Sequence, residues 1–78
     1  MKFKTLRKML TVTTYVIRVV YLDNKTEEVK ITRYNIDYLN EITEDFVETL
    51  NLLDSLNPLS VKFVGTVGGL LEITLEIK

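Results

Sequence analysis

The stretch Tyr15–Leu22, YVIRVVYL, decides the fold, because it is apolar on both sides of an extended chain. Alternate residues of a strand point to opposite faces of a sheet. One face of this stretch carries Tyr15, Ile17, Val19 and Tyr21. The other face is also apolar apart from Arg18. A strand that is apolar on both faces is typical of the centre of a sheet, so we predict that this stretch forms a central strand.

A return strand is expected directly after the central one. Asp23-Asn24-Lys25-Thr26 has the composition of a turn, and residues 28–34 (EVKITRY) alternate again between apolar and polar side chains. Cross-strand partners share a face, so Val29 and Ile31 can join the Tyr15 face only across an odd loop of three or five residues. We therefore predict a hairpin over residues 12–34.

The next segment changes to helical spacing. Apolar residues recur at steps of three and four, at Leu39, Ile42, Phe46, Leu50 and Leu53. Asn35 or Asp37 can cap the start of this segment, and Asn57-Pro58 ends it because proline cannot continue a helix. The spacing predicts one long helix over residues 36–56, with a single apolar stripe that covers the sheet.

A second hairpin is expected over residues 59–78, around the glycines of the chain. A phosphate-binding loop would need a different glycine spacing and a following helix, whereas the residues after Gly69 alternate as a strand. A two-residue Gly68-Gly69 turn would pair apolar with polar positions. We expect a three-residue loop, Gly68-Gly69-Leu70, which pairs Val67 with Leu71 and Phe63 with Leu75.

Together these elements predict one α+β domain over residues 1–78, with the order ββαββ. The four-stranded sheet is expected in the order 2-1-4-3, with the long helix on one face. A short N-terminal helix within the basic segment 1–11 would place Phe3, Leu6 and Leu10 on one side. This layout is similar in topology to the β-grasp of the immunoglobulin-binding domain of protein G, and such a likeness carries no function.

The composition argues against an enzyme. The chain has no Cys and no His, so it lacks disulfides, thiolate metal sites, the usual general base and the strongest nucleophile. We expect no catalytic residue, no metal and no cofactor. No apolar run approaches the roughly 20 residues that span a bilayer, and the N-terminus lacks a secretory cleavage signal. We therefore expect a cytoplasmic protein without a membrane partner.

The distribution of charge suggests a contact surface. All ten Lys and Arg residues lie in 1–33 or 62–78. On the predicted helix, Asp37–Glu41 and Glu44–Glu48 are like-charged pairs four residues apart, each of which costs about 0.2–0.5 kcal/mol. The predicted partner-binding residues are Asp37, Glu41, Glu44, Asp45 and Glu48. A solvated face is the plain alternative; the sharper interpretation is an acidic strip that meets a basic surface on a protein partner.

The sheet face away from the helix offers other interpretations. Arg18, Lys30 and Lys62 are expected there beside apolar residues, namely Val16, Val20, Leu22, Tyr34 and Val64. Either the N-terminal segment covers this face, or the face is a homodimer or partner interface. Nucleic-acid binding would use the basic arm Lys2, Lys4, Arg7 and Lys8 with stacking on Tyr34, and the net charge of −1 disfavours it.

We therefore expect a small non-enzymatic protein-binding module. The alternatives are a homo-oligomer built through the outer sheet face or an exposed strand edge, and a nucleic-acid-binding protein that uses the basic arm. In size, in composition and in its lack of catalytic residues, the chain resembles small proteins of phages and mobile elements of low-GC bacteria. That group includes anti-CRISPR and anti-restriction inhibitors, several of which imitate the charge of DNA. The resemblance lies in format alone and implies no site residue.

Overall fold

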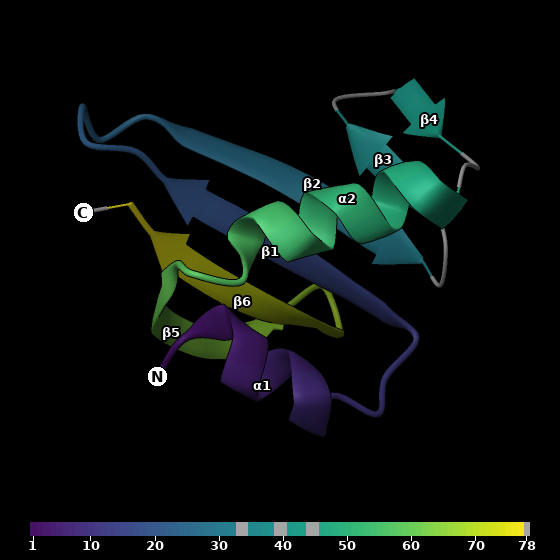
Figure 1. Cartoon of the computed structure of the whole chain (residues 1–78), viewed down its shortest axis with the longest axis horizontal. Helices are drawn as coiled ribbons and strands as arrows, with labels where there is room; N and C mark the ends of the chain where they lie inside the picture. The colour runs from purple at the N-terminus through teal and green to yellow at the C-terminus, as the bar shows by residue number, and fades with distance from the viewer. Residues whose placement is uncertain (33–34, 39–40, 44–45, 78) are drawn as a thin grey trace.

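A computed structural model describes residues 1–32, 35–38, 41–43 and 46–77, with 35–38, 41–43 and Phe46 described by backbone only. The chain is α+β, as predicted (Figure 1). Its elements are α1 (Phe3–Met9), β1 (Thr14–Val20), β2 (Thr26–Thr32), β3 (Asn35–Tyr38), β4 (Glu41–Thr43), α2 (Phe46–Leu56), β5 (Ser60–Val67) and β6 (Leu70–Glu76).

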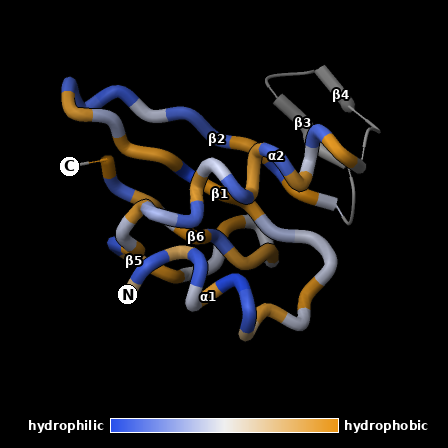
Figure 2. The backbone as a smooth tube through the Cα atoms, viewed as in Figure 1, coloured by the Kyte–Doolittle hydropathy of each residue, from blue (hydrophilic) through white to orange (hydrophobic). Residues whose placement is uncertain are grey.

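All described strands join one sheet in the order β4-β3-β2-β1-β6-β5. The four strands that the sequence predicts therefore lie in the predicted order 2-1-4-3, as β2-β1-β6-β5. β1 pairs with β2 antiparallel and with β6 parallel, so the strand that is apolar on both faces lies inside the sheet, as predicted. Figure 2 shows β1 as mostly hydrophobic and the part of β2 near the hairpin tip as hydrophilic.

The β1–β2 hairpin confirms the predicted odd loop. Val20 pairs with Thr26, which leaves five residues in the loop, and Ile17 pairs with Val29 on the core face. Asn24 adopts a positive φ of 65°, a conformation that Asn tolerates better than most residues. The Lys25 N–H donates a hydrogen bond to the Asp23 carboxylate at 3.1 Å, which closes the turn as an Asx motif.

The predicted helix boundary at residue 36 is wrong. Residues 35–38 and 41–43 form β3 and β4, and the helix begins at Phe46. Asn, Ile, Asp, Tyr and Thr all have low intrinsic helix propensity, and NIDY alternates as a strand as well as it fits a helix. β3 lies antiparallel to β2, with Ile36 paired to Ile31. The edge of β2 thus gains a partner, and hydrogen bonding of that edge outweighs the helical spacing.

The rest of α2 follows the prediction. It ends at Leu56, immediately before Asn57-Pro58. Leu53 and Leu56 are buried in the core together with the β-sheet residues, and Leu50 is half-buried. Thr49, which the apolar spacing did not include, is also buried. Leu39, predicted on the same stripe, lies outside the described residues.

The N-terminal helix packs on the same face of the sheet as α2 (Figure 1). Phe3 is 0% exposed in the core, and Leu6 and Leu10 pack against the core. The Phe3 N–H donates to the Leu59 carbonyl at 2.9 Å, which satisfies one of the unpaired N–H groups at the start of a helix. The N-terminal segment therefore does not cover the opposite face, one of the two alternatives that the sequence left open.

The β5–β6 connection differs from the predicted three-residue loop. Val67 pairs with Leu70, and the two turn residues, Gly68 and Gly69, have φ values of 55° and 82°, as a type I′ hairpin turn requires. The expected mixing of apolar and polar positions is only partly avoided: Thr66 still pairs with Leu71, and a bulge between Val61 and Phe63 prevents Lys62 from pairing with Leu75. Val61 pairs with the core residue Leu75 as a result, and Phe63 pairs with Thr74 instead of Leu75.

Replacing Phe3 tests whether α1 is part of the core. Phe3→Ala should lower the free energy of unfolding by about 3–5 kcal/mol, because it removes a fully buried aromatic ring and leaves a cavity. Met9→Ala is the control: Met9 is exposed at the end of the same helix, and its loss should change stability by less than about 0.5 kcal/mol. Urea unfolding of the three chains measures both effects. Equal stability of the two variants would contradict the placement of α1.

The tyrosine of the central strand gives the fold a pH dependence. Burial raises the pKa of the Tyr15 hydroxyl above 10.0, and the nearby Arg7 opposes this in part. The folded state thus holds the proton more tightly than the unfolded chain, so its stabilising contribution is present below pH 10.0 and is lost as the pH rises through the folded pKa. Between pH 10.0 and the folded pKa, the free energy of unfolding should fall less steeply with pH in Tyr15→Phe than in the wild type. Parallel pH profiles in urea titrations would contradict this.

Candidate interaction surface

The sheet has one face without a helix, which we call the outer face. Register places on it alternate residues of β1, β2 and β6 and, beyond the bulge, of β5. Its members on the central strands include Val16, Arg18, Val20, Thr26, Glu28, Lys30, Glu72, Thr74 and Glu76. No described helix lies over this face (Figure 1). The outer face is therefore a mixed apolar and charged surface, open among the described residues.

Arg18 lies at the centre of the outer face. Its Nε is 3.8 Å from a carboxylate oxygen of Glu28, a distance too long for a hydrogen bond. That Nε is buried and finds no hydrogen-bond partner among the residues that the structure describes. Val16 and Val20, on either side of Arg18, are half-buried. The face thus combines partly exposed valines with one incompletely satisfied cation.

The edge of β5 is the second feature of this surface. At its start, the Val61 N–H donates to the Met1 carbonyl at 2.8 Å, and Lys2 forms a bridge with Ser60. From Lys62 to Val67, which we call the free edge, β5 has no strand partner on its outer side among the described residues. Phe63 is 61% exposed and Val67 47% exposed, and both point to the outer face by register. An apolar strand edge of this kind is a template for pairing with another chain.

Gly65 allows the ring of Phe63 to lie along the free edge. A Cβ at Gly65 would lie only 2.6 Å from Cε1 of Phe63. The two residues are neighbours on the same face of β5, so the ring occupies the space that any other side chain at position 65 would fill. The absence of a side chain on Gly65 thus leaves room for the ring of the largest exposed apolar residue of β5.

The predicted acidic strip is not one helical stripe. The backbone of Asp37 lies in β3, paired with Lys30, and that of Glu41 lies in β4, paired with Tyr38. Of the three predicted residues that the structure describes, Glu48 lies in α2, where it is exposed. Glu44 and Asp45 lie outside the described residues. The like-charge helical spacing that motivated the strip therefore does not exist for Asp37 and Glu41, because helix formation begins after both.

The basic N-terminal arm is partly neutralised within the molecule. Arg7 donates to the Asp54 carboxylate at 2.7 Å and to the Asn57 side-chain oxygen at 3.4 Å. Lys4 and Lys8 line a hollow of about 290 Å³ with Arg7 and Asn57. Tyr34, the expected stacking residue, lies outside the described residues. Arg7 of the arm thus links α1 to the end of α2. This structural role accounts for Arg7 without a contact to nucleic acid.

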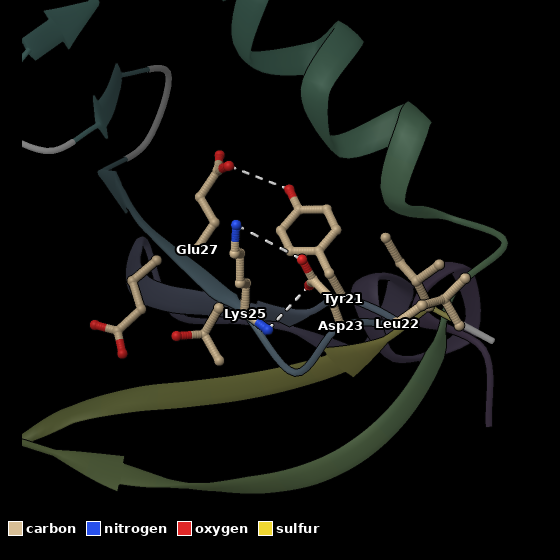
Figure 3. A pocket seen from close by; sticks show the side chains of 8 residues that line it. Tyr21, Leu22, Asp23, Lys25 and Glu27 are labelled. Atoms are coloured by element: carbon tan, nitrogen blue, oxygen red, sulfur yellow. Dashed lines mark hydrogen bonds and ion pairs between the residues drawn. The ribbon is translucent and has the colours of Figure 1, made fainter.

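A larger hollow, of about 700 Å³, lies at the tip of the β1–β2 hairpin (Figure 3). The Tyr21 hydroxyl donates to Glu27 at 3.1 Å, and Lys25 lies 3.8 Å from Asp23. Burial, and then Glu27, raises the pKa of the Tyr21 hydroxyl. A smaller, mainly apolar hollow of about 240 Å³ on the helix side shares Tyr21, Glu27 and Ile77 with it. Two pairs of polar groups around the larger hollow, Tyr21 with Glu27 and Lys25 with Asp23, are thus engaged with each other.

Two further observations concern only the part of the chain that the structure describes. It contains no group of three or more acidic, histidine or cysteine residues placed to hold a metal ion. None of its helices combines the length and apolar character needed to cross a bilayer. Comparisons with protein families, with curated proteins and with solved structures find no match for this chain. The candidate surface is therefore argued from its own geometry.

Sequence reasoning missed Phe63 and Val67 as surface residues. It placed Lys62 and Val64 on the outer face because it assumed an unbroken alternation along β5. The bulge reverses that alternation, so Val64 pairs with the core residue Ile73. A signal was present, because residues 63–71 contain no charged side chain, an unusual length for a strand and turn at the edge of a sheet.

A substitution at Gly65 tests the packing of the Phe63 ring. Gly65→Ala should lower the free energy of unfolding by about 1 kcal/mol, because the new methyl group displaces the ring. In a Phe63→Ala background the same substitution should cost nothing, which gives a coupling of about 1 kcal/mol in the double-mutant cycle. Urea unfolding of the four chains provides the measurement. An equal cost in both backgrounds would show that the ring is not the obstacle.

Proposed function

We propose that this chain is a protein-binding module that acts by contact and not by catalysis. Its contact surface is the free edge of β5 together with the adjoining part of the outer face. The observation that carries the proposal is the free edge itself: it is apolar, exposed at Phe63 and Val67, and unpaired among the described residues. Both side chains lie where the edge and the outer face meet.

The physical argument rests on two contributions that act at the same place. The backbone N–H and C=O groups along a sheet edge form hydrogen bonds with an added strand, which gives affinity, and side chains on alternate positions give specificity. Burial of exposed apolar area adds about 25 cal/mol per Å². A partner strand at the free edge gains both contributions, because Phe63 and Val67 flank the backbone of Gly65.

The chemistry of the chain favours contact over catalysis. With no His and no Cys, proton transfer near neutral pH would need a carboxylate, a lysine or a tyrosine with a strongly altered pKa. The two tyrosines with raised pKa values, Tyr15 and Tyr21, are less ready to ionise. Because both hydroxyls stay protonated near neutral pH, neither is suited to act as a base.

The acidic residues become secondary in this proposal. Asp37 and Glu41 lie on strands, and Asp54 is engaged by Arg7, so the expected acidic helix face gives way to the free edge as the main contact. The resemblance in format to small phage inhibitors supports the same class of function, since such inhibitors act by binding a protein. It adds no residue to the surface.

A pull-down that compares the wild type with two single-residue variants as the immobilised protein tests the proposal. Val67→Lys places a charge in the apolar edge and should abolish capture of a partner protein from an extract of the native host, because burial of that charge is costly. Leu22→Lys is the matched control: it also replaces an exposed apolar residue, 76% exposed, but at the distant hairpin tip. Quantitative mass spectrometry compares the captured proteins.

The expected result is a protein that the wild type and Leu22→Lys retain and Val67→Lys loses. Circular dichroism and urea unfolding must show that both variants fold like the wild type, which their exposed positions favour. A partner captured equally by all three baits would show that the contact surface lies elsewhere on the chain.

A further inference from the structure

We propose that the free edge of β5 binds a second copy of this chain. The two β5 strands run antiparallel about a two-fold axis at Gly65 and join two sheets into one. This inference rests on the proposed contact function and names its partner. It follows from how the edge is protected, from its register, from its charge and from the contrast with the opposite edge of the sheet.

The free edge is protected only at its start. Sheet edges are usually shielded by charged residues, bulges, proline, shortness or a covering segment. β5 has Lys62 and the bulge between Val61 and Phe63, and both lie next to the place where Met1 already pairs with Val61. From Phe63 to Val67 there is no charge and no proline, and no described segment covers the outer side of the strand. This uncovered part is centred on Gly65.

A pairing centred on Gly65 matches the two edges residue by residue. Partners in an antiparallel pair share a face, so Phe63 lies opposite Val67 of the second copy, and Val64 lies opposite Thr66. The two Gly65 residues meet at the axis, where neither presents a side chain to the other. The partner strand reaches its Gly68-Gly69 turn just where the N-terminal segment begins to cover β5. No other centre pairs both exposed apolar residues of the outer face with each other.

The charges of the chain permit this pairing. Symmetric association places each charged residue near its own copy or near the residue opposite it. In this register Lys62 lies opposite Gly68, and no two like charges face one another along the strand. The net charge of −1 means that two whole chains repel only weakly. An edge lined with lysines or glutamates would lack this compatibility.

The opposite edge of the sheet explains why the association stops at a dimer. β4 spans only three residues, Glu41–Thr43, and short edge strands are poor templates. Pairing of β5 with β4 of another copy is a head-to-tail contact, which forms a ring or continues into a filament. Pairing of β5 with β5 uses the longer apolar edge twice, and among the described residues the remaining edge strand, β4, spans only three residues.

The size of the contact sets its strength. Stable protein interfaces bury about 1,200–2,000 Å² in total, and smaller ones belong to weak or transient complexes. Strand pairing from Phe63 to Val67 involves a short segment with two exposed apolar side chains on the outer face and Val64 on the other. We therefore expect a reversible dimer whose population rises across the micromolar to millimolar range.

Sedimentation equilibrium of the purified chain over that concentration range tests the dimer. The wild type and Leu22→Lys should show the same concentration-dependent rise from monomer to dimer mass, whereas Val67→Lys should remain monomeric. A wild type that is monomeric at every concentration overturns the inference, as does a Val67→Lys variant that dimerises like the wild type.

Two single-cysteine variants test the register, and the natural chain offers no competing thiol. Val64→Cys and Thr66→Cys lie at exposed positions and become direct partners, with Cα atoms about 4.5–5.5 Å apart, within the range of a disulfide. Each is about 7–8 Å from its own copy. Oxidation of a mixture should therefore yield more mixed covalent dimer than either variant yields of its own. A mixture of Thr66→Cys with Leu22→Cys is the control, and equal yields in both mixtures overturn the register.

The two proposals fail separately. If the chain stays monomeric while Val67→Lys still abolishes capture of a host protein, the edge binds a different protein and the self-pairing is wrong. If the chain dimerises through Val67 and captures no host protein in a Val67-dependent way, the contact function is self-association alone.

Discussion

The parallel pairing of β1 with β6 is the interaction on which the rest of the structure depends. It places Ile17 beside Ile73 and Val19 beside Leu75, and all four are buried in the core. Parallel strands cannot be joined by a tight turn and need a crossover connection. The chain supplies α2 in that connection, and α2 packs Leu53 and Leu56 onto the same core. The N-terminal and C-terminal hairpins become one sheet only through this pairing.

A chain of this size has few ways to bury enough apolar surface. A domain of 78 residues buries only about 60–65% of its unfolded surface, so each packed element matters for a net stability of a few kcal/mol. Both helices are used on one face, where Phe3 completes the core between α1 and the sheet. No described element remains for the outer face. The open face and the free edge thus follow from concentrating both helices on the core side.

The order of strands was predictable because it depends on long, unambiguous apolar patterns. Apolar residues on both faces identify β1 as a central strand. Val29 and Ile31 must lie on the same face as Tyr15, and this requirement gives the hairpin register. The start of α2 was not predictable in the same way, because residues 36–43 satisfy helical and strand spacing together and the unpaired edge of β2 decides between them. The acidic stripe was inferred from a helix that begins at residue 36. Because α2 begins at Phe46, the predicted contact site is no longer one helical stripe. The end of α2 carried no such ambiguity, since proline excludes helix directly.

The bulge in β5 explains both the error in turn length and the exposure of Phe63. Strict alternation from Val61 through a two-residue turn would place Lys62 opposite Leu75. One extra residue in the strand removes this pair, although Thr66 still lies opposite Leu71. Val61 and Val64 then both pair with core residues, while Phe63 is displaced to the outer face. The Phe63 ring lies along Gly65, and Phe63 pairs with the buried Thr74, yet Phe63 is still 61% exposed, so most of this large aromatic side chain faces solvent. The missing side chain of Gly65 leaves room for that ring. A contact with another strand accounts for both residues at once, since the ring then has a surface to cover and the glycine lets two backbones approach.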